Sequence, residues 1–194
     1  MDKFDIAQDF TARWEGGLSD DKADRGGLTN YGVCIEFLKD FASSDDKRTF
    51  LASLGVHPLP VTRDTIRNLT IPQARAIFKR EFWDSLHLDD MPIQMGVLLY
   101  DAAVNSGRSR SVKLAQRGFN AVSAQKSSLA VDGILGPLTR AALANNNTRE
   151  VRSAIVTARE NFYKDIVRNN ASQYVFLKGW LNRAADLRRY MEAL

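Results

Sequence analysis

The sequence predicts a mostly helical α+β fold, and three observations support this prediction. Apolar side chains recur at helical spacing near the start of the chain, at Phe4, Ala7, Phe10 and Trp14. The segment that follows, 16–33, contains five glycines and is typical of turns around a short β-hairpin. The apolar stretch 93–106 then predicts a long helix that is buried at the centre of the fold.

The other element boundaries follow from capping residues, prolines and glycines. The first helix is expected to end at Glu15, because the glycine pair 16–17 follows it. A helix is expected from Thr70-Ile71-Pro72 to about Trp83, and Gly136-Pro137 begins another. Further helices are expected at 34–42, 45–54, 63–68, 110–123, 137–145, 149–169 and 173–192. Gly179, inside the last of these, is expected to permit close packing of a neighbouring helix.

Composition and charge restrict the classes of function. The 194 residues include one cysteine, Cys34, which excludes an intramolecular disulfide and is expected to be a small buried residue. The net charge of +4 suits an anionic polymer, and both nucleic acid and bacterial cell wall qualify. His57 and His87 have no third ligand at metal spacing, and phosphate-loop, dinucleotide and nucleophile-elbow motifs are absent. We therefore expect neither a metal nor a cofactor.

The candidate chemistry lies where the first helix meets the glycine-rich segment. Glycosidic cleavage needs a protonated carboxylic acid that donates to the leaving oxygen, and a second polar group that holds water or stabilises positive charge. Glu15, with Asp24 and Thr29 in the following segment, supplies these groups. The spacing alone also fits an ordinary helix end followed by solvated turn carboxylates, so both interpretations stay open at this point.

The same stretch resembles the active-site region of glycoside hydrolase family 108, a group of phage-type lysozymes. The resemblance rests on Glu15-Gly16-Gly17 and on the segment 26–33, which reads Gly-Gly-Leu-Thr-Asn-Tyr-Gly-Val. The wider phage-lysozyme triad has a Glu, eight residues, Asp or Cys, five residues, and Thr. Here eight residues separate Glu15 from Asp24, but four separate Asp24 from Thr29. The resemblance implies Glu15, Asp24 and Thr29 as catalytic residues.

The resemblance continues through most of the chain, at 100–107, at the turn 131–139 and at 176–183. It implies a lysozyme-like fold of two lobes around a cleft, joined by a central helix. We expect a catalytic lobe over 1–92. A helical lobe over 93–194, with a peptidoglycan-binding-like segment, is expected to form one compact unit with the first.

Several polar and aromatic residues in these motifs allow two interpretations. Asn30 and Tyr31 are expected to bind substrate. Asp101 and Asn105 share one helical face with Arg108, so they can line the cleft and bind sugar, or Asp101 can be a buried anchor for a basic residue. The turn 131–139 is interpreted as structural rather than as a wall-binding element. The tryptophans are interpreted as core residues rather than sugar platforms, at Trp83 and Trp180.

The resemblance implies an endolysin-like, bacteriolytic muramidase that cleaves the β-1,4 bond between N-acetylmuramic acid and N-acetylglucosamine, with inversion. A lytic transglycosylase and a non-catalytic helical protein that binds cell wall or nucleic acid are the alternatives. We expect peptidoglycan as the partner, no nucleic-acid partner, and a monomer. The acidic N-terminus differs from a signal peptide, and no run reaches the ~18 apolar residues of a membrane span. Synthesis in a bacterial host cytoplasm and holin-mediated release to the wall are therefore expected.

Overall fold

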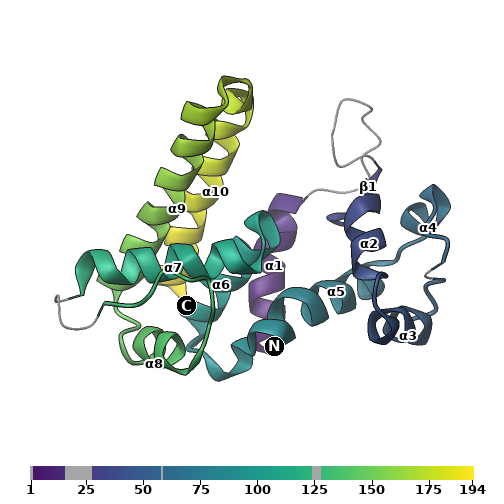
Figure 1. Ribbon diagram of the computed structural model, residues 1–194, viewed down its shortest axis with the longest axis horizontal. Helices are drawn as coiled ribbons and strands as arrows, with labels where there is room; N and C mark the ends of the chain where they lie inside the picture. Colours follow the sequence, from purple (N-terminus) through teal and green to yellow (C-terminus); the bar gives the residue numbers. More distant parts are fainter. Residues whose placement is uncertain (1, 16–27, 58, 124–127) are drawn as a thin grey trace. The chain divides into compact units, whose positions relative to one another are not determined.

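The computed structural model describes residues 2–15, 28–57, 59–123 and 128–194. Within these ranges the chain is mostly α-helical with one two-stranded antiparallel sheet, which confirms the α+β prediction (Figure 1). The chain divides into two compact units. The helical unit consists of Met1–Phe10 and Phe82–Leu194, and the hairpin unit consists of Thr11–Glu81.

The hairpin unit contains the small sheet and a set of short helices. Its elements are the last turn of α1 (Lys3–Glu15), β1 (Thr29–Asn30), β2 (Val33–Cys34), α2 (Ile35–Phe41), α3 (Asp45–Ser53), α4 (Arg63–Arg67) and α5 (Ile71–Phe78). In the sheet, Thr29 pairs with Cys34 and Asn30 pairs with Val33. The connecting turn is Tyr31-Gly32, with φ of 50° and 80°. A two-residue turn with positive φ at both positions matches the right-handed twist of the strands, so it closes this hairpin tightly.

Two local expectations in the hairpin unit need correction. Cys34 is half-buried rather than a core residue, and it caps α2 by accepting a hydrogen bond from the Phe37 amide at 3.4 Å. The helix that begins after Thr70 does not stay α-helical to Trp83. It ends at Phe78 and continues as a turn of π-helix, η1 (Lys79–Trp83). Its start is as expected, because Thr70 and Gln73 form a reciprocal capping box.

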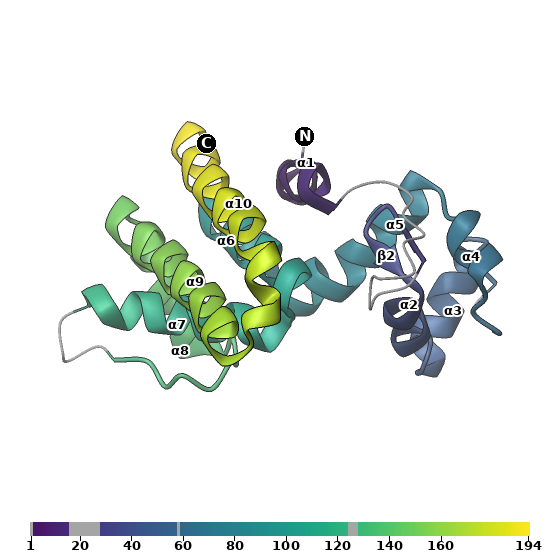
Figure 2. The same ribbon diagram turned by 90° about the horizontal axis from the view of Figure 1, so that it is seen from above.

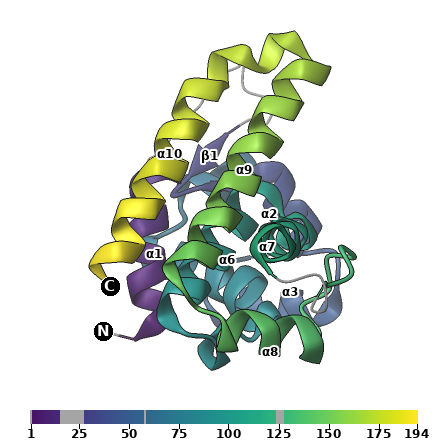
Figure 3. The same cartoon turned by 90° about the vertical axis from the view of Figure 1, so that its left-hand side faces the viewer.

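The helical unit is built around α6 (Ile93–Ser106), in which every residue from Met95 to Ala103 is buried. The other elements are η2 (Asp84–Leu86), η3 (Leu88–Asp90), α7 (Arg108–Val122), α8 (Pro137–Asn145), α9 (Arg149–Asn169), η5 (Ala171–Gln173) and α10 (Tyr174–Ala193). Figures 2 and 3 show α9 and α10 side by side as an antiparallel helical pair. No helix in the described ranges is long and apolar enough to cross a membrane.

The close helix contact in this unit involves a different glycine from the one expected. The space beside Gly179 is open, with no atom within 4 Å of an added Cβ, so the expectation for this residue was wrong. A Cβ added to Gly118 of α7 would instead lie 2.4 Å from Cα of Ile155. The backbones of α7 and α9 therefore meet at Gly118, where any side chain would force the two helices apart.

Candidate active site

Glu15 is the last residue of α1 and is half-buried. The turn of the hairpin packs directly against it, because a Cβ added to Gly32 would lie 3.0 Å from Cβ of Glu15. The same added atom would lie 3.1 Å from Cζ of Phe78 in α5. Gly32 is thus needed both for its positive φ and for its lack of a side chain. The hairpin turn, α5 and the end of α1 therefore meet at Cβ of Glu15, and together they fix the point from which its side chain extends.

The neighbouring residues of the hairpin differ in their burial and in their hydrogen bonds. Thr29 is half-buried on β1. Asn30 is 5% exposed, and its amide nitrogen donates to the carbonyl oxygens of Ile66 at 3.0 Å and Leu69 at 3.3 Å. The first carbonyl lies in the last turn of α4 and the second lies just after the helix, where regular helical hydrogen bonding ends. Asn30 therefore ties the hairpin to α4, whereas Tyr31 is exposed and accessible to a ligand.

The remaining catalytic candidate, Asp24, lies outside the described residues, as do the glycines at 26 and 27. The structure thus brings Glu15 and the Thr29–Tyr31 stretch into one unit and assigns Asp101 and Asn105 to the other. Phe78 was not among the candidates, because no local pattern shows that an aromatic ring of α5 meets the hairpin turn. Among the described residues, no three His, Cys, Asp or Glu side chains gather as a metal site.

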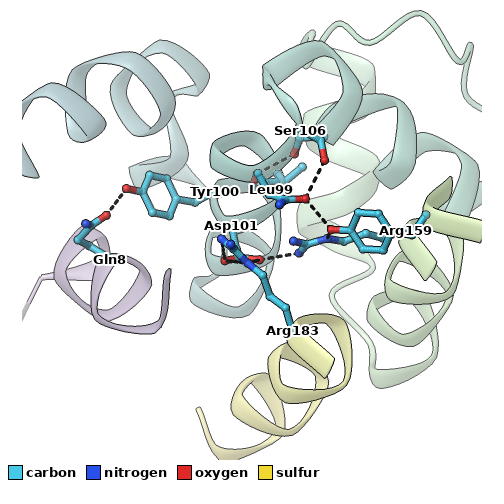
Figure 4. Close-up of polar contacts among 10 residues, drawn as sticks. Gln8, Leu99, Tyr100, Asp101, Ser106, Arg159 and Arg183 are labelled. Atoms are coloured by element: carbon cyan, nitrogen blue, oxygen red, sulfur yellow. Dashed lines mark hydrogen bonds and ion pairs between the residues drawn. The ribbon is translucent and has the colours of Figure 1, made fainter. Parts of the chain in front are cut away.

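Asp101 is completely buried on α6 in the helical unit. Its carboxylate accepts from Nη1 of Arg159 at 2.6 Å and from Nη2 of Arg183 at 2.7 Å (Figure 4). Burial by itself raises the pKa of Asp101, but the two guanidinium groups outweigh it and lower the pKa to about 2. Of the two interpretations of Asp101, these contacts are those of a buried anchor.

Asn105 continues the same polar network one helical turn further along α6. Its Oδ1 accepts from the Tyr163 hydroxyl at 2.6 Å, and that hydroxyl accepts from Nε of Arg159 at 2.5 Å. Arg159 is 2% exposed, and its Nη2 has no hydrogen-bond partner among the described residues. Two arginines thus share one carboxylate in the core, and the ionised trio carries a net charge of +1.

The turn at 131–139 is held by one buried side chain of α7. The amide of Gln116 donates to Asp132 at 2.8 Å and to the Thr139 hydroxyl at 3.2 Å, and its oxygen accepts from the Gly133 amide at 3.0 Å. Asp132 also accepts from the Ile134 amide at 2.8 Å, and this bond, followed by the one from Gln116, lowers the pKa of Asp132. These bonds support the structural interpretation of the turn.

The two tryptophans occupy different environments. Trp83 is fully buried, and its indole nitrogen donates to Asp89 at 3.0 Å. Trp180 is half-buried and stacks on Tyr163 with ring centroids 5.3 Å apart. Trp83 is therefore a core residue as expected, whereas Trp180 lies at the edge of the core, against Tyr163, so the expectation of a core position was wrong for this residue.

Comparison with known proteins places this arrangement in a family. No curated protein matches the chain. A solved structure, that of SagA from Brucella abortus, superposes with a TM-score of 0.73 and 25% sequence identity, and the match covers 98% of this chain and 94% of that one. Residues 110–185 match the family described as Predicted Peptidoglycan domain. Residues 8–107 match Glycosyl hydrolase 108, which confirms the resemblance. The chain therefore belongs to glycosyl hydrolase family 108 and is a lysozyme-type glycoside hydrolase with a lysozyme-like fold.

Proposed function

We propose that this protein is an N-acetylmuramidase. It hydrolyses the β-1,4 bond between N-acetylmuramic acid and N-acetylglucosamine in bacterial peptidoglycan, with Glu15 as the general acid. The observation that supports this assignment is the position of Glu15 at the end of α1, against the Gly32 turn, within the family-matched segment. A helix end and a tight hairpin are rigid elements, and catalysis requires that the acid be held at a defined place.

In the proposed reaction, Glu15 donates its proton to the glycosidic oxygen as the bond to the leaving sugar breaks. Asp24 stabilises the developing positive charge or helps to activate water, and Thr29 helps to hold that water. The resemblance implies inversion at the anomeric carbon. Inversion needs space for a water between the two carboxyl groups, which stand ~6.5–9.5 Å apart in inverting enzymes.

The identity of the products tests this proposal. Digestion of purified peptidoglycan is expected to release fragments that end in reducing N-acetylmuramic acid, with the α-anomer as the first product. Mass spectrometry identifies the end group, and proton NMR before mutarotation identifies the anomer. A 1,6-anhydro sugar would instead indicate a lytic transglycosylase, and a β-anomer would indicate retention. Binding of the wall without any released fragment would indicate a non-catalytic protein.

The geometry around Gly32 gives a second prediction. Gly32→Ala is expected to lower the rate of wall cleavage by roughly 10–10²-fold, because the new Cβ displaces the Glu15 side chain from its place beside the turn. The positive φ also costs about 1–2 kcal/mol of unfolding free energy in any residue with a Cβ. Clearing of a peptidoglycan suspension measures the rate, and urea unfolding measures the stability.

Gly55 provides the matched control, because its φ is +73° and an added Cβ would meet nothing within 4 Å. Gly55→Ala is expected to lose the same ~1–2 kcal/mol from its positive φ, without the steric cost at Gly32, while the folded protein retains its cleavage rate. If Gly32→Ala were as active as Gly55→Ala, the turn would not position the acid.

A further inference from the structure

A groove lies between α7 and α9 in the helical unit, within the segment matched to the peptidoglycan domain. Its volume is about 620 Å³, which is within the range of sites that bind small molecules. It lies beside the close contact at Gly118, and its lining includes the small side chains of Ala121, Ala154 and Ala158. Three methyl side chains in the lining leave space for a narrow chain along the groove.

The rim of the groove carries groups of both charges. Arg117 on α7 and Asn161 on α9 are exposed, and neither has a hydrogen bond or ion pair among the described residues. Asp165 lines the groove further along α9, where it pairs with Arg168 at 2.7 Å. The groove therefore offers a cation that is not neutralised, an amide, and a carboxylate.

The length of the groove indicates how long a ligand it can hold. Its lining residues on α9 extend from Ser153 to Asp165, which are twelve positions apart. At ~1.5 Å per helical residue this is ~18 Å, the length of about five residues of extended peptide. A glycan strand, by contrast, is commonly held by stacking on open aromatic faces. The Phe162 ring in the lining already has the Arg110 guanidinium 4.7 Å from its centroid.

We infer that this groove binds the peptide stem of peptidoglycan rather than its glycan strand. A stem peptide has small alanine side chains that fit against the alanines of the lining, free carboxylates that pair with Arg117, and the amine of its diamino acid for Asp165. The inference rests on the proposed function only for the identity of the polymer. It assigns the two parts of that polymer to different units, with the sugar bond at the hairpin unit and the peptide at the helical unit.

Calorimetric titration of the full chain tests the inference. The probes are the isolated stem tetrapeptide, alanine–glutamate–diaminopimelate–alanine, and the glycan freed of peptide by an amidase. The wild type is expected to bind the tetrapeptide, and Arg117→Gln is expected to weaken that binding by about tenfold, because a charge-assisted contact is lost. Arg189→Gln is the matched control, since Arg189 is 71% exposed on α10, pairs with Asp186 and lies outside the groove. It is expected to bind like the wild type.

Ala158→Leu supplies a second variant, because the larger side chain fills part of the groove without changing its charge. It is expected to abolish tetrapeptide binding. If it fails to fold, Arg117→Gln still tests the inference, because Arg117 is exposed. Absence of tetrapeptide binding by the wild type would overturn the inference, as would equal binding by Arg117→Gln and Arg189→Gln. Loss of glycan binding in Arg117→Gln would also overturn it. The titration requires no turnover, so a protein that binds the peptide but cleaves no wall would refute the proposed muramidase and leave this inference standing.

Discussion

Replacement of Glu15 by glutamine is expected to abolish wall cleavage and leave the fold unchanged. The amide has nearly the same shape as the carboxyl group, so the contact with the Gly32 turn is kept. It cannot deliver a proton to the leaving oxygen, and general acids contribute about 10²–10⁴-fold to such rates. The release of reducing ends from purified peptidoglycan measures the loss, and the melting temperature of the variant is expected to match that of the wild type.

The control for this substitution is Glu36→Gln in the same unit. Glu36 is an exposed residue of α2, paired with Lys39 at 2.9 Å, so the same chemical change there removes only a surface ion pair. Its rate is expected to equal that of the wild type. If Glu15→Gln kept substantial activity at unchanged thermal stability, another group would have to be the acid.

The elements that were predicted correctly are those that short sequence signals define. The Thr70–Gln73 capping box and Pro137 mark helix starts, and the glycines after Glu15 mark a helix end. Such signals act within one helical turn, so they can be read from consecutive residues. The π-helix after Phe78 was not predicted. Its apolar residues continue the periodicity of the α-helix before it, so the sequence pattern does not distinguish the two.

The contacts that organise the site depend on residues far apart in the chain. Asn30 bonds to a carbonyl 36 positions away, and the two arginines of Asp101 lie 58 and 82 positions from it. The sequence indicated that a polar residue in the apolar helix at 93–106 needed a partner, but it did not show which of many basic residues supplied it. The same holds for Gly118 and Gly179, because only the path of α9 decides which glycine meets another helix.

The Asp101 network also connects the two matched segments of the chain. Asp101 belongs to α6, within residues 8–107, whereas Arg159 and Arg183 belong to α9 and α10, within residues 110–185. The buried carboxylate therefore has both of its cationic partners in the other segment. This arrangement explains in physical terms why α6 forms one compact unit with the helices that follow it.

Asp101→Asn is accordingly expected to cost the most of the substitutions proposed, about 3–5 kcal/mol of unfolding free energy, because it removes the negative charge that two buried guanidinium groups share. Arg183→Gln is expected to cost less, because Asp101 and Arg159 then remain as a neutral pair. The exposed pair of Asp165 and Arg168 supplies the control, and Asp165→Asn is expected to cost less than about 1 kcal/mol. Urea unfolding at neutral pH gives all three values, and a cost for Arg183→Gln above that for Asp101→Asn would contradict this account.

The pH dependence of stability provides an independent check on the same residue. The pKa of Asp101 is about 2 in the folded protein, below its ordinary value of 3.8, so the folded state favours the ionised carboxylate. Its contribution is therefore fully present above about pH 4 and is lost as the pH falls toward 2, and the difference in pKa corresponds to about 2 kcal/mol. The Asp101→Asn variant lacks this group, so its unfolding free energy is expected to fall less steeply between about pH 4 and 2 than that of the wild type. Parallel slopes for the two proteins in urea titrations across this range would show that Asp101 is not held ionised by its two arginines.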